Sequence, residues 1–329
     1  MKIAVLGAGA WGTALAITLA RAHEVRLWVW DSADLEALRA TRENRRFLAG
    51  FPVPPAVRID GNVGAALEGA DLVLVVVPTG ALRETLHRAA DVSGTVPVIW
   101  ACKGFEPASA KLPHQVAGEV LGGSRRLGVL SGPSFAQEVA RGLPTAVTLA
   151  CADAAYAAEV ARELNSHRLR LYHSADVVGV EVGGAVKNVI AIAAGISDGL
   201  GFGHNARAAL ITRGLAEMTR LGIALGGHQE TFLGLSGAGD LILTCTGDLS
   251  RNRRVGLGLA AGKTLDAILA ELGHVAEGVH TSQEVRALAK TRGVGMPITE
   301  TVCHMLFEGL DPRSAVEALL SREPRAEGG

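Results

Sequence analysis

The chain has 329 residues, of which 48% are hydrophobic, 20% are charged and 4% are aromatic, and it contains 41 glycines. Lysine and arginine number 32 against 33 for aspartate and glutamate, so the formal net charge is −1. This balance excludes a global field that would draw the protein onto nucleic acid or an anionic membrane, and the apolar content excludes intrinsic disorder. A chain of this length accommodates two domains.

The four cysteines lie far apart in the sequence, and no two histidines have the spacing of metal ligands. The pattern favours neither a disulfide framework nor a metal site, and it is typical of a reduced, cytoplasmic protein. One uncharged run, residues 3–20 behind Lys2, is long enough to resemble a signal peptide or a membrane helix. Because Gly7, Gly9 and Gly12 interrupt the run, a strand, a turn and a helix account for it better, and no membrane insertion is expected.

The first half of the chain alternates between short apolar runs and helical patterns. Continuous runs such as Val73–Val77 indicate strands buried on both faces, which are typical of a parallel sheet with helices on both sides. Helical patterns or long connections separate the runs, for example Ser32–Arg45, Ala81–Ala90 and Phe135–Ala140. The expected strands are Ile3–Leu6, Val25–Trp30, Leu72–Val77, Val96–Ala101, Leu127–Ser131 and Ala146–Ala150.

From about Asp176 onward the strand patterns disappear and long helical patterns follow. We therefore expect an α/β protein with a parallel-sheet domain over residues 1–178 and an all-helical domain over residues 179–329. No Pro- or Ser-rich linker marks the boundary, so one long helix near Val180 is expected to join the two. The expected helices are Val177–Ser197, Ala206–Leu221, Arg251–Ala261, Thr281–Arg292, Ile298–Phe307 and Ser314–Leu320.

A glycine turn follows the first expected strand. Residues 7–12 read Gly-Ala-Gly-Ala-Trp-Gly, which is the spacing G-x-G-x-x-G between a strand and a helix. In dinucleotide-binding proteins the first glycine permits the tight turn, the second lets the backbone approach a pyrophosphate, and the third allows close packing. The helix amino terminus would direct free N–H groups towards the phosphates. The sequence predicts a dinucleotide site here, against the alternative of an ordinary strand–turn–helix.

Asp31 ends the second expected strand, 19 residues after Gly12. A carboxylate there can bond a ribose 2′-hydroxyl and so favour NAD, or it can cap the helix that follows, and the sequence leaves both open. Trp30 is placed to flank the adenosine, with core packing as its alternative. Three basic residues could approach a 2′-phosphate, although a solvated helix face accounts for them better: Arg42, Arg45 and Arg46.

Lys187 is the first candidate for catalysis. It lies in an apolar helical pattern, with Gly183 and Gly184 four and three residues before it on the same face. Glycine inside a helix costs up to about 1 kcal/mol, and one reason to keep two is the close approach of a ring or a substrate. Desolvation beside that gap would lower the pKa of the lysine and let it exchange a proton with a hydroxyl. The alternative is a surface lysine beside a helix contact.

Asp240 and Thr244 form an i, i+4 pair on a helix that follows a glycine loop. The carboxylate could orient Lys187 or hold a substrate hydroxyl, with a helix N-cap as its alternative. His204, in a loop beside a glycine, is a rival base. Two cysteines are expected to be buried fillers rather than nucleophiles: Cys102 and Cys245.

Ser250 is placed to cap a helix that ends near Gly262, so that Arg251 lies on its first turn. Free N–H groups of a helix terminus and a forked guanidinium are two independent parts of a phosphate site. The alternative is a solvated basic helix start, which opposes the dipole preference for acids there. The loops at Lys103 and at residues 131–136 follow expected strands, so they lie on the side where ligands bind in open α/β sheets.

Six motifs occur together, at residues 7–12, 103–104, 132–136, 183–188, 239–241 and 250–254. In this combination the chain resembles the NAD(P)-dependent glycerol-3-phosphate dehydrogenases of the bacterial type over nearly its whole length. The resemblance implies a Rossmann domain followed by an all-helical domain, and a homodimer. It also implies the reversible reduction of dihydroxyacetone phosphate to sn-glycerol 3-phosphate by NADH or NADPH, for glycerophospholipid synthesis.

The resemblance also assigns roles to individual residues. It makes Lys187 the proton donor and acceptor, with Asp240 and Thr244 as its catalytic neighbours. The implied substrate contacts are Lys103, Gly132, Ser134, Lys187, Asp240, Ser250, Arg251 and Asn252. The implied cofactor contacts are Gly7, Gly9, Ala10, Trp11, Gly12, Trp30, Lys103, Ala136, Arg251, Val275 and Glu277. Some members of the family carry a basic residue where this chain has Trp30 and Asp31, which leaves the choice between NAD and NADP open.

Two other functions fit parts of the same pattern. A dehydrogenase of β-hydroxy acids on the same architecture would also use Arg251, because a carboxylate suits a guanidinium as well as a phosphate does. A non-catalytic NAD(P)-binding sensor would need the glycine turn alone, and the cluster around Lys187 argues against it. Turnover of a panel of substrates separates the three.

Overall fold

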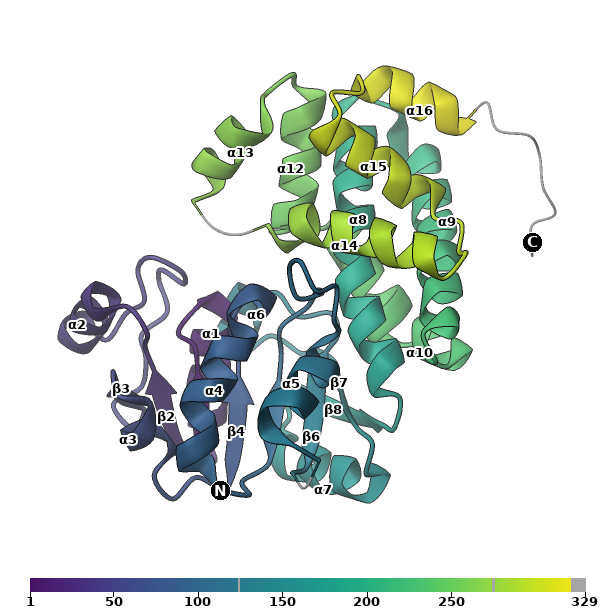
Figure 1. The fold of residues 1–329 in the computed structure, drawn as a ribbon. Coiled ribbons are helices and arrows are strands. Elements are labelled where there is room, and N and C mark those ends of the chain that lie inside the picture. The colour runs from purple at the N-terminus through teal and green to yellow at the C-terminus, as the bar shows by residue number, and fades with distance from the viewer. Residues whose placement is uncertain (124, 274–275, 321–329) are drawn as a thin grey trace.

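The computed structural model describes residues 1–123, 125–273 and 276–320. Its first part is an eight-stranded sheet in the order β3-β2-β1-β4-β5-β6-β7-β8 (Figure 1). The strands are β1 (Lys2–Leu6), β2 (Glu24–Trp28), β3 (Arg58–Asp60), β4 (Leu72–Val75), β5 (Val98–Trp100), β6 (Leu127–Ser131), β7 (Thr145–Cys151) and β8 (Leu169–Ser174). Neighbouring strands are parallel except β6 and β7, which are antiparallel, so the sheet is mixed rather than wholly parallel.

The six expected strands are present, and two more lie at the edges of the sheet. In β8 buried and exposed positions alternate over most of the strand, and β3 has only three residues. Edge strands of this kind carry no continuous apolar run, because one face or one end of the strand meets solvent. A search for runs buried on both faces therefore passes over them.

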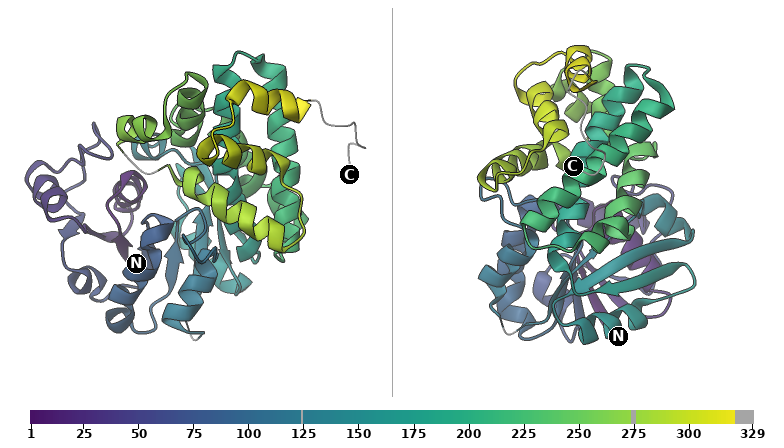
Figure 2. Two further views of the ribbon diagram at one scale, coloured as in Figure 1. Left: turned by 45° about the horizontal axis from the view of Figure 1, so that its top comes forward. Right: turned by 90° about the vertical axis from the view of Figure 1, so that its right-hand side faces the viewer.

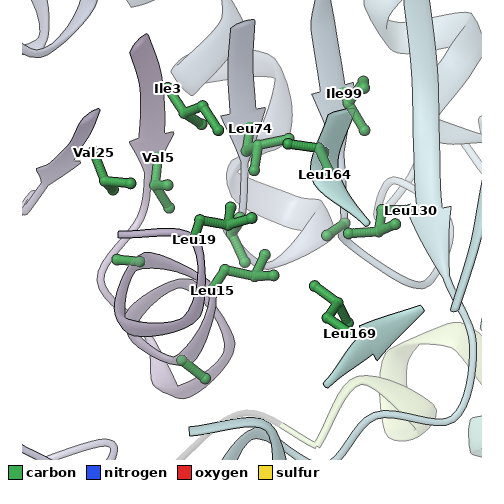
Figure 3. Packing of buried hydrophobic residues seen from close by; sticks show 14 of the residues in the cluster. Ile3, Val5, Leu15, Leu19, Val25, Leu74, Ile99, Leu130, Leu164 and Leu169 are labelled. Carbon is green, nitrogen blue, oxygen red and sulfur yellow. The ribbon is translucent and has the colours of Figure 1, made fainter. Parts of the chain in front are cut away.

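Helices cover both faces of the sheet. On one face lie α1 (Ala10–Leu19), α6 (Ala136–Arg141) and α7 (Ala154–Leu164), whose apolar side chains share one buried cluster with the strands. Figure 3 shows Leu15 and Leu19 of α1 directed towards the sheet, near Val5 and Leu74. The other face is covered by α3 (Val63–Leu67), α4 (Leu82–Ser93) and α5 (Pro113–Leu121). The helix α2 (Ser32–Thr41) packs beside β3 at the sheet edge.

The second part of the chain is helical and lies over one end of the sheet (Figures 1 and 2). Its central helix, α8 (Val177–Gly199), is buried from Gly179 to Ser197. By length and composition α8 could cross a membrane, but 89% of its most apolar window is buried inside the protein, so it is a core helix. Around it lie α9 (Gly203–Ala224), α10 (Gln229–Leu233), α11 (Asp240–Thr246), α12 (Arg251–Ala260), α13 (Leu265–Leu272), α14 (Glu277–Thr291), α15 (Pro297–Phe307) and α16 (Pro312–Leu320).

The start of α8 is held by one carboxylate. Asp176 accepts a hydrogen bond at Oδ1 from the Gly179 N–H at 2.8 Å, which caps the helix. Its Oδ2 accepts from the His228 N–H at 2.9 Å and from the Thr231 hydroxyl at 2.5 Å. The point where the chain leaves the sheet is therefore tied to α10 and to the residue before it.

The helices α8 and α12 cross with their backbones in contact. A Cβ atom on Gly195 would lie 2.0 Å from the Arg253 carbonyl oxygen, and one on Gly256 would lie 2.0 Å from the Ile192 carbonyl oxygen. Real Cβ atoms do not approach backbone atoms so closely. The two glycines therefore fix how near the first half of α12 comes to the carboxyl-terminal half of α8.

We predict that Gly256→Ala lowers the free energy of unfolding by at least about 1–3 kcal/mol, the usual cost of overpacking a core. The measurement is the urea midpoint. Gly118→Ala in α5 is the matched control, because no atom lies within 4 Å of its Cβ position. That variant should be neutral or stabilised by about 0.5–1 kcal/mol. Equal midpoints for the two variants would show that the crossing is looser than described.

Candidate active site

The glycine turn after β1 has the geometry that a dinucleotide needs. Gly7 has φ +116°, and a Cβ there would lie 2.4 Å from the Val76 carbonyl oxygen. A Cβ on Gly12 would lie 1.9 Å from the Gly7 carbonyl oxygen, so both residues close the turn. Gly9 has nothing within 4 Å of its Cβ position, and it precedes α1 without a side-chain cap. The turn thus presents open space and uncapped N–H groups, which fit a pyrophosphate.

Two exposed side chains lie between β2 and α2. Asp31 is the N-cap of α2, since its Oδ1 accepts from the Asp34 N–H at 2.9 Å, and the capping interpretation is confirmed. Trp30 is 59% exposed, so core packing is wrong as an account of it. Its ring meets the Trp28 ring edge-on at 5.9 Å between centroids, and the Arg88 guanidinium lies 4.0 Å from its centroid.

Lys187 is buried and bonded on two sides. Its Nζ donates to Asp240 Oδ1 at 2.5 Å and to the Thr244 hydroxyl at 3.0 Å. Only 8% of the Lys187 side chain and 1% of the Asp240 side chain are exposed. The alternatives of a surface lysine and of an Asp240 N-cap are therefore both wrong, and no side chain caps α11.

The same carboxylate binds a second lysine. Lys103, in the loop after β5, donates from Nζ to Asp240 Oδ2 at 2.7 Å and to the Gly132 carbonyl oxygen at 3.0 Å. Two ammonium groups therefore share Asp240, and the pair with Lys103 joins the sheet to the helical part. The three side chains together carry one net positive charge at the carboxyl ends of β5 and β6.

This arrangement sets the protonation of Lys187. Burial lowers the pKa of Lys187 to about 8; the Asp240 carboxylate opposes this shift, and the Lys103 ammonium adds to it. An amine with a pKa near neutral pH can both give and accept a proton under physiological conditions. The cluster can therefore exchange a proton with a bound oxygen and stabilise negative charge on it.

The glycines before Lys187 do not leave room for a ligand, contrary to the sequence-based expectation. A Cβ on Gly183 would lie 2.4 Å from the Ser236 carbonyl oxygen, and one on Gly184 would lie 2.8 Å from the Ser131 hydroxyl. Protein atoms fill both positions. The expected glycine loop before Asp240 is a π-helical turn, Leu235–Gly239, which packs against this part of α8. The glycines allow α8 to pack closely against its neighbours.

The start of α12 lies in contact with the same helix. Ser250 caps it by accepting from the Arg253 N–H at 3.2 Å, as the sequence predicts. Arg251 is exposed on the first turn, and its charge interacts with the Glu277 carboxylate, whose pKa burial raises. Asn252 is buried; its Nδ2 donates to Asn188 Oδ1 at 2.9 Å, and its Oδ1 accepts from the Gly278 N–H at 3.0 Å.

The remaining candidates lie on nearby loops and helix starts. Gly132 has φ +135° and its carbonyl accepts from the Ser134 hydroxyl at 2.9 Å. Ala136 begins α6 and Ala10 begins α1, while Trp11 packs partly buried against the sheet cluster. One candidate cofactor contact, Val275, lies outside the described residues.

Sequence reasoning did not select two residues that border this site. Asn188 follows Lys187 and accepts a hydrogen bond from Asn252. A polar amide in an otherwise apolar helix was the feature of the sequence that could have indicated this role. Ser131 ends β6 with a buried hydroxyl that, within the described part of the chain, has no hydrogen-bond partner. Serine at a strand end is too common to stand out without the fold.

The other candidates form no second centre. His204 is exposed and its Nδ1 lies 2.9 Å from Arg207 Nη2. All four cysteines are free and buried, and burial raises the pKa of each thiol. Among the described residues no group of three or more His, Cys, Asp or Glu side chains is arranged to hold a metal ion.

A glycine turn at the start of a doubly wound sheet, followed by a helical region that buries a lysine, is typical of the class of dinucleotide-dependent dehydrogenases. Models of the NAD-dependent glycerol-3-phosphate dehydrogenase family match residues 2–157 with the N-terminus and residues 176–317 with the C-terminus. The chain belongs to this family.

Curated relatives and a solved structure agree with that assignment. The chain is 61% identical to glycerol-3-phosphate dehydrogenase (NAD(P)+) of Nitrosospira multiformis, covering 99% of both chains. It is 60% identical to the enzyme of that name from Thiobacillus denitrificans, covering 99% of this chain and 100% of the relative. The crystal structure of glycerol-3-phosphate dehydrogenase from Coxiella burnetii matches with a TM-score of 0.94 at 44% identity, covering 98% of this chain and 99% of the other.

Proposed function

We propose that this protein catalyses the reversible reduction of dihydroxyacetone phosphate to sn-glycerol 3-phosphate with NADH or NADPH, for glycerophospholipid synthesis. Family membership supports the activity, and the observation that carries it in the structure is the buried Lys187 held by Asp240. We place the division between a cofactor domain and a substrate domain at residues 178 and 179, close to where α8 begins.

Lys187 is the proton donor in the reduction. When bound, the nicotinamide supplies the hydride that the carbonyl carbon accepts. The Lys187 ammonium stabilises negative charge on the carbonyl oxygen and gives it a proton. In the reverse direction the neutral amine accepts the hydroxyl proton. A pKa of about 8 leaves both forms accessible.

Two neighbours, Asp240 and Thr244, hold Lys187 in position. The charge of Lys187 depends on Asp240 and on Lys103. Asp240 and Thr244 fix Nζ through bonds of 2.5 and 3.0 Å. The Lys103 ammonium, 2.7 Å from the other carboxylate oxygen, takes up part of the negative charge of Asp240. The site keeps a net positive charge, which favours a substrate with a phosphate group.

The start of α12 binds the phosphate. The N–H groups of its first turn and the exposed Arg251 guanidinium supply donors from one helix end. Ser250 and Asn252 shape this turn through their bonds to Arg253 and Gly278. Holding a remote phosphate places the carbonyl in a reactive geometry next to Lys187.

The deciding experiment is an assay of purified protein with glycerol 3-phosphate and with dihydroxyacetone phosphate, followed at the absorbance of the reduced cofactor. NADH and NADPH are compared side by side, and β-hydroxy acids serve as the competing substrates. Turnover of the phosphorylated three-carbon pair supports the proposal. Tight cofactor binding without any turnover would favour a sensor, and turnover of hydroxy acids alone would favour that class of dehydrogenase.

The rates in the two directions should depend on pH in opposite ways. Reduction needs the ammonium form of Lys187, so its initial rate should fall as pH rises through about 8. Oxidation needs the neutral amine, so its rate should rise over the same range. Lys187→Ala should lower kcat by at least about 10²-fold and remove this ionisation. A folded variant that keeps both the rate and the pH profile would assign the role elsewhere, with His204 as the next candidate.

Arg251→Ala should lower kcat/KM for phosphorylated substrate by about 30-fold to several thousand-fold, which corresponds to about 2–5 kcal/mol for a desolvated charge pair. Arg251→Lys should restore only part of the loss, because an ammonium lacks the planar fork. Unphosphorylated dihydroxyacetone should be affected far less.

Arg254→Ala is the control for Arg251, since this exposed arginine lies one turn along the same helix and its loss changes the charge equally. The dissociation constant of the cofactor is measured separately for each variant. If phosphorylated and unphosphorylated substrates lose equally, Arg251 is a structural or cofactor residue.

We further propose a cytoplasmic homodimer. The four free, buried cysteines suit a reducing compartment. Three neighbouring helices each expose an apolar side chain to about half or more of its full extent. These side chains are Ile223 at the end of α9, Leu233 in α10 and Ile242 in α11. Exposed apolar patches mark interaction surfaces, and a second copy of the chain would cover this one.

Light scattering should give a mass near twice 34.0 kDa for the native protein. Leu233→Glu should shift it towards the monomer, because a carboxylate would be buried in the interface. Leu143→Glu, at a side chain exposed on the loop after α6, is the control and should remain a dimer. A native mass of 34.0 kDa at working concentration would contradict the proposal.

A further inference from the structure

We propose that Glu181 is a positioning residue for the Lys187 amine, because it closes both ends of the loop that carries Lys103 and holds that loop against α8. The inference rests on the proposed function, in which Lys187 exchanges the proton with the substrate. Glu181 itself bonds Trp100 and His114, so it acts on the site through the loop.

One carboxylate receives hydrogen bonds from both ends of the loop between β5 and α5. Glu181 Oε1 accepts from the indole Nε1 of Trp100, the last residue of β5, at 2.8 Å. The same oxygen accepts from the His114 N–H at 2.9 Å, and Oε2 lies 2.5 Å from His114 Nδ1. His114 is the second residue of α5, where backbone N–H groups have no partner inside the helix. Residues 101–112 therefore begin and end beside Glu181.

The burial of Glu181 makes these bonds necessary. Its side chain is 1% exposed, and Trp100 is fully buried. Burial raises the pKa of Glu181, and the hydrogen bonds from His114 and Trp100 oppose this rise. A buried carboxylate is stable only where hydrogen bonds and charge compensate its lost hydration. Because three hydrogen-bonding groups converge on it, moving either end of the loop away is unfavourable.

The loop in turn places Lys103 along α8. Lys103 lies three residues after Trp100, and Gly184 lies one helical turn after Glu181. A Cβ on Gly184 would lie 3.4 Å from Lys103 Cγ and 3.7 Å from Cδ, so the lysine side chain runs against this turn. Lys187 lies a further turn along the helix, where the two ammonium groups share one carboxylate.

The position of Lys103 affects the protonation of Lys187. Burial and the Lys103 ammonium lower the pKa of Lys187, whereas Asp240 raises it. If the loop moves away from α8, the repulsion weakens and the pKa of Lys187 rises. A loss of the Glu181 charge by itself would act in the opposite direction, because removing a negative charge lowers the pKa of an amine. The direction of the shift therefore separates positioning from a long-range charge effect.

The test is a pH titration of the lysine ¹³Cε signals by NMR in the purified full-length protein, without substrate. The chain has six lysines, and spectra of Lys187→Ala and Lys103→Arg assign the two signals of the site. The native pKa of Lys187 should be about 8. Glu181→Ala should raise it by at least about 0.5, a modest part of what a neighbouring charge produces. An unchanged or lowered pKa overturns the inference.

Two further variants separate the bonds of the carboxylate from its charge. Glu181→Gln keeps an oxygen that accepts from the Trp100 indole and the His114 N–H, so the pKa of Lys187 should stay at the native value. A lowered value there would assign the effect to charge and overturn the inference. Trp100→Phe keeps an aromatic ring but removes one donor, and it should raise the pKa of Lys187. This variant decides the question if Glu181→Ala does not fold, and the absence of a rise counts against the role of Glu181.

Glu217→Ala is the matched control. Glu217 is also a buried glutamate that bonds the start of a helix, since its carboxylate accepts from the Ile298 N–H at 2.6 Å and from the Thr299 N–H at 3.3 Å. It joins α9 to α15, so its loss should lower the urea midpoint without changing the pKa of Lys187. An equal rise of that pKa in both variants would show a general loosening of the fold and overturn the role of Glu181.

Turnover gives a separate readout. Glu181→Ala should lower kcat for glycerol 3-phosphate oxidation about tenfold, because small displacements of a catalytic group are costly. Glu181→Gln should restore most of the rate, and equal losses in the two variants would contradict a positioning role. Because the NMR titration uses no substrate, it succeeds or fails whether or not the protein turns over glycerol 3-phosphate. A failure of the inference is therefore distinguishable from a failure of the proposed function.

Discussion

The site depends on one interaction, the pairing of the Asp240 carboxylate with the ammonium groups of Lys103 and Lys187. The carboxylate is almost fully buried, and it is stable there because two ammonium groups offset its desolvation. Each lysine comes from a different part of the fold: Lys187 from the middle of α8 and Lys103 from the loop after β5. The carboxylate thus influences the charge of the Lys187 amine and also holds the helical part over the end of the sheet.

Close backbone packing places the groups that surround this carboxylate. The helix α8 meets the π-helical turn at Gly183, the end of β6 at Gly184, and α12 at Gly195. Each contact leaves no room for a side chain, and at Gly183 and Gly195 the blocking atoms belong to the backbone of the neighbouring element. Side-chain packing alone would allow larger shifts, because flexible side chains adapt to small displacements. The amine and the first turn of α12 therefore share one rigid frame.

Local patterns in the sequence predicted most of this arrangement. The glycine turn, the buried runs of the central strands, the length of α8 and the Ser250 cap are all set by residues close together in the chain. The residues alone left the pairing of Lys187 with Asp240, 53 residues away, as one of several roles for the carboxylate, and the resemblance to a family favoured it. The roles of Gly183 and Gly184 were misjudged, because only the fold shows that Ser236 and Ser131 face them. Strand β3 and the antiparallel pairing of β6 with β7 likewise depend on partners distant in sequence.

Because all four cysteines are free and buried, the reactivity of their thiols can report local opening of the structure. Cys102 lies just beyond β5, Cys151 ends β7, and the other two lie in α11 and α15, so the four sample both parts of the fold. Because the thiolate is the reactive form, a raised pKa and burial together keep a native thiol inert. Alkylation at each position then measures how often that region exposes itself. Alkylation of Cys245, one residue after Thr244, would follow opening around the Lys187 amine without an engineered cysteine.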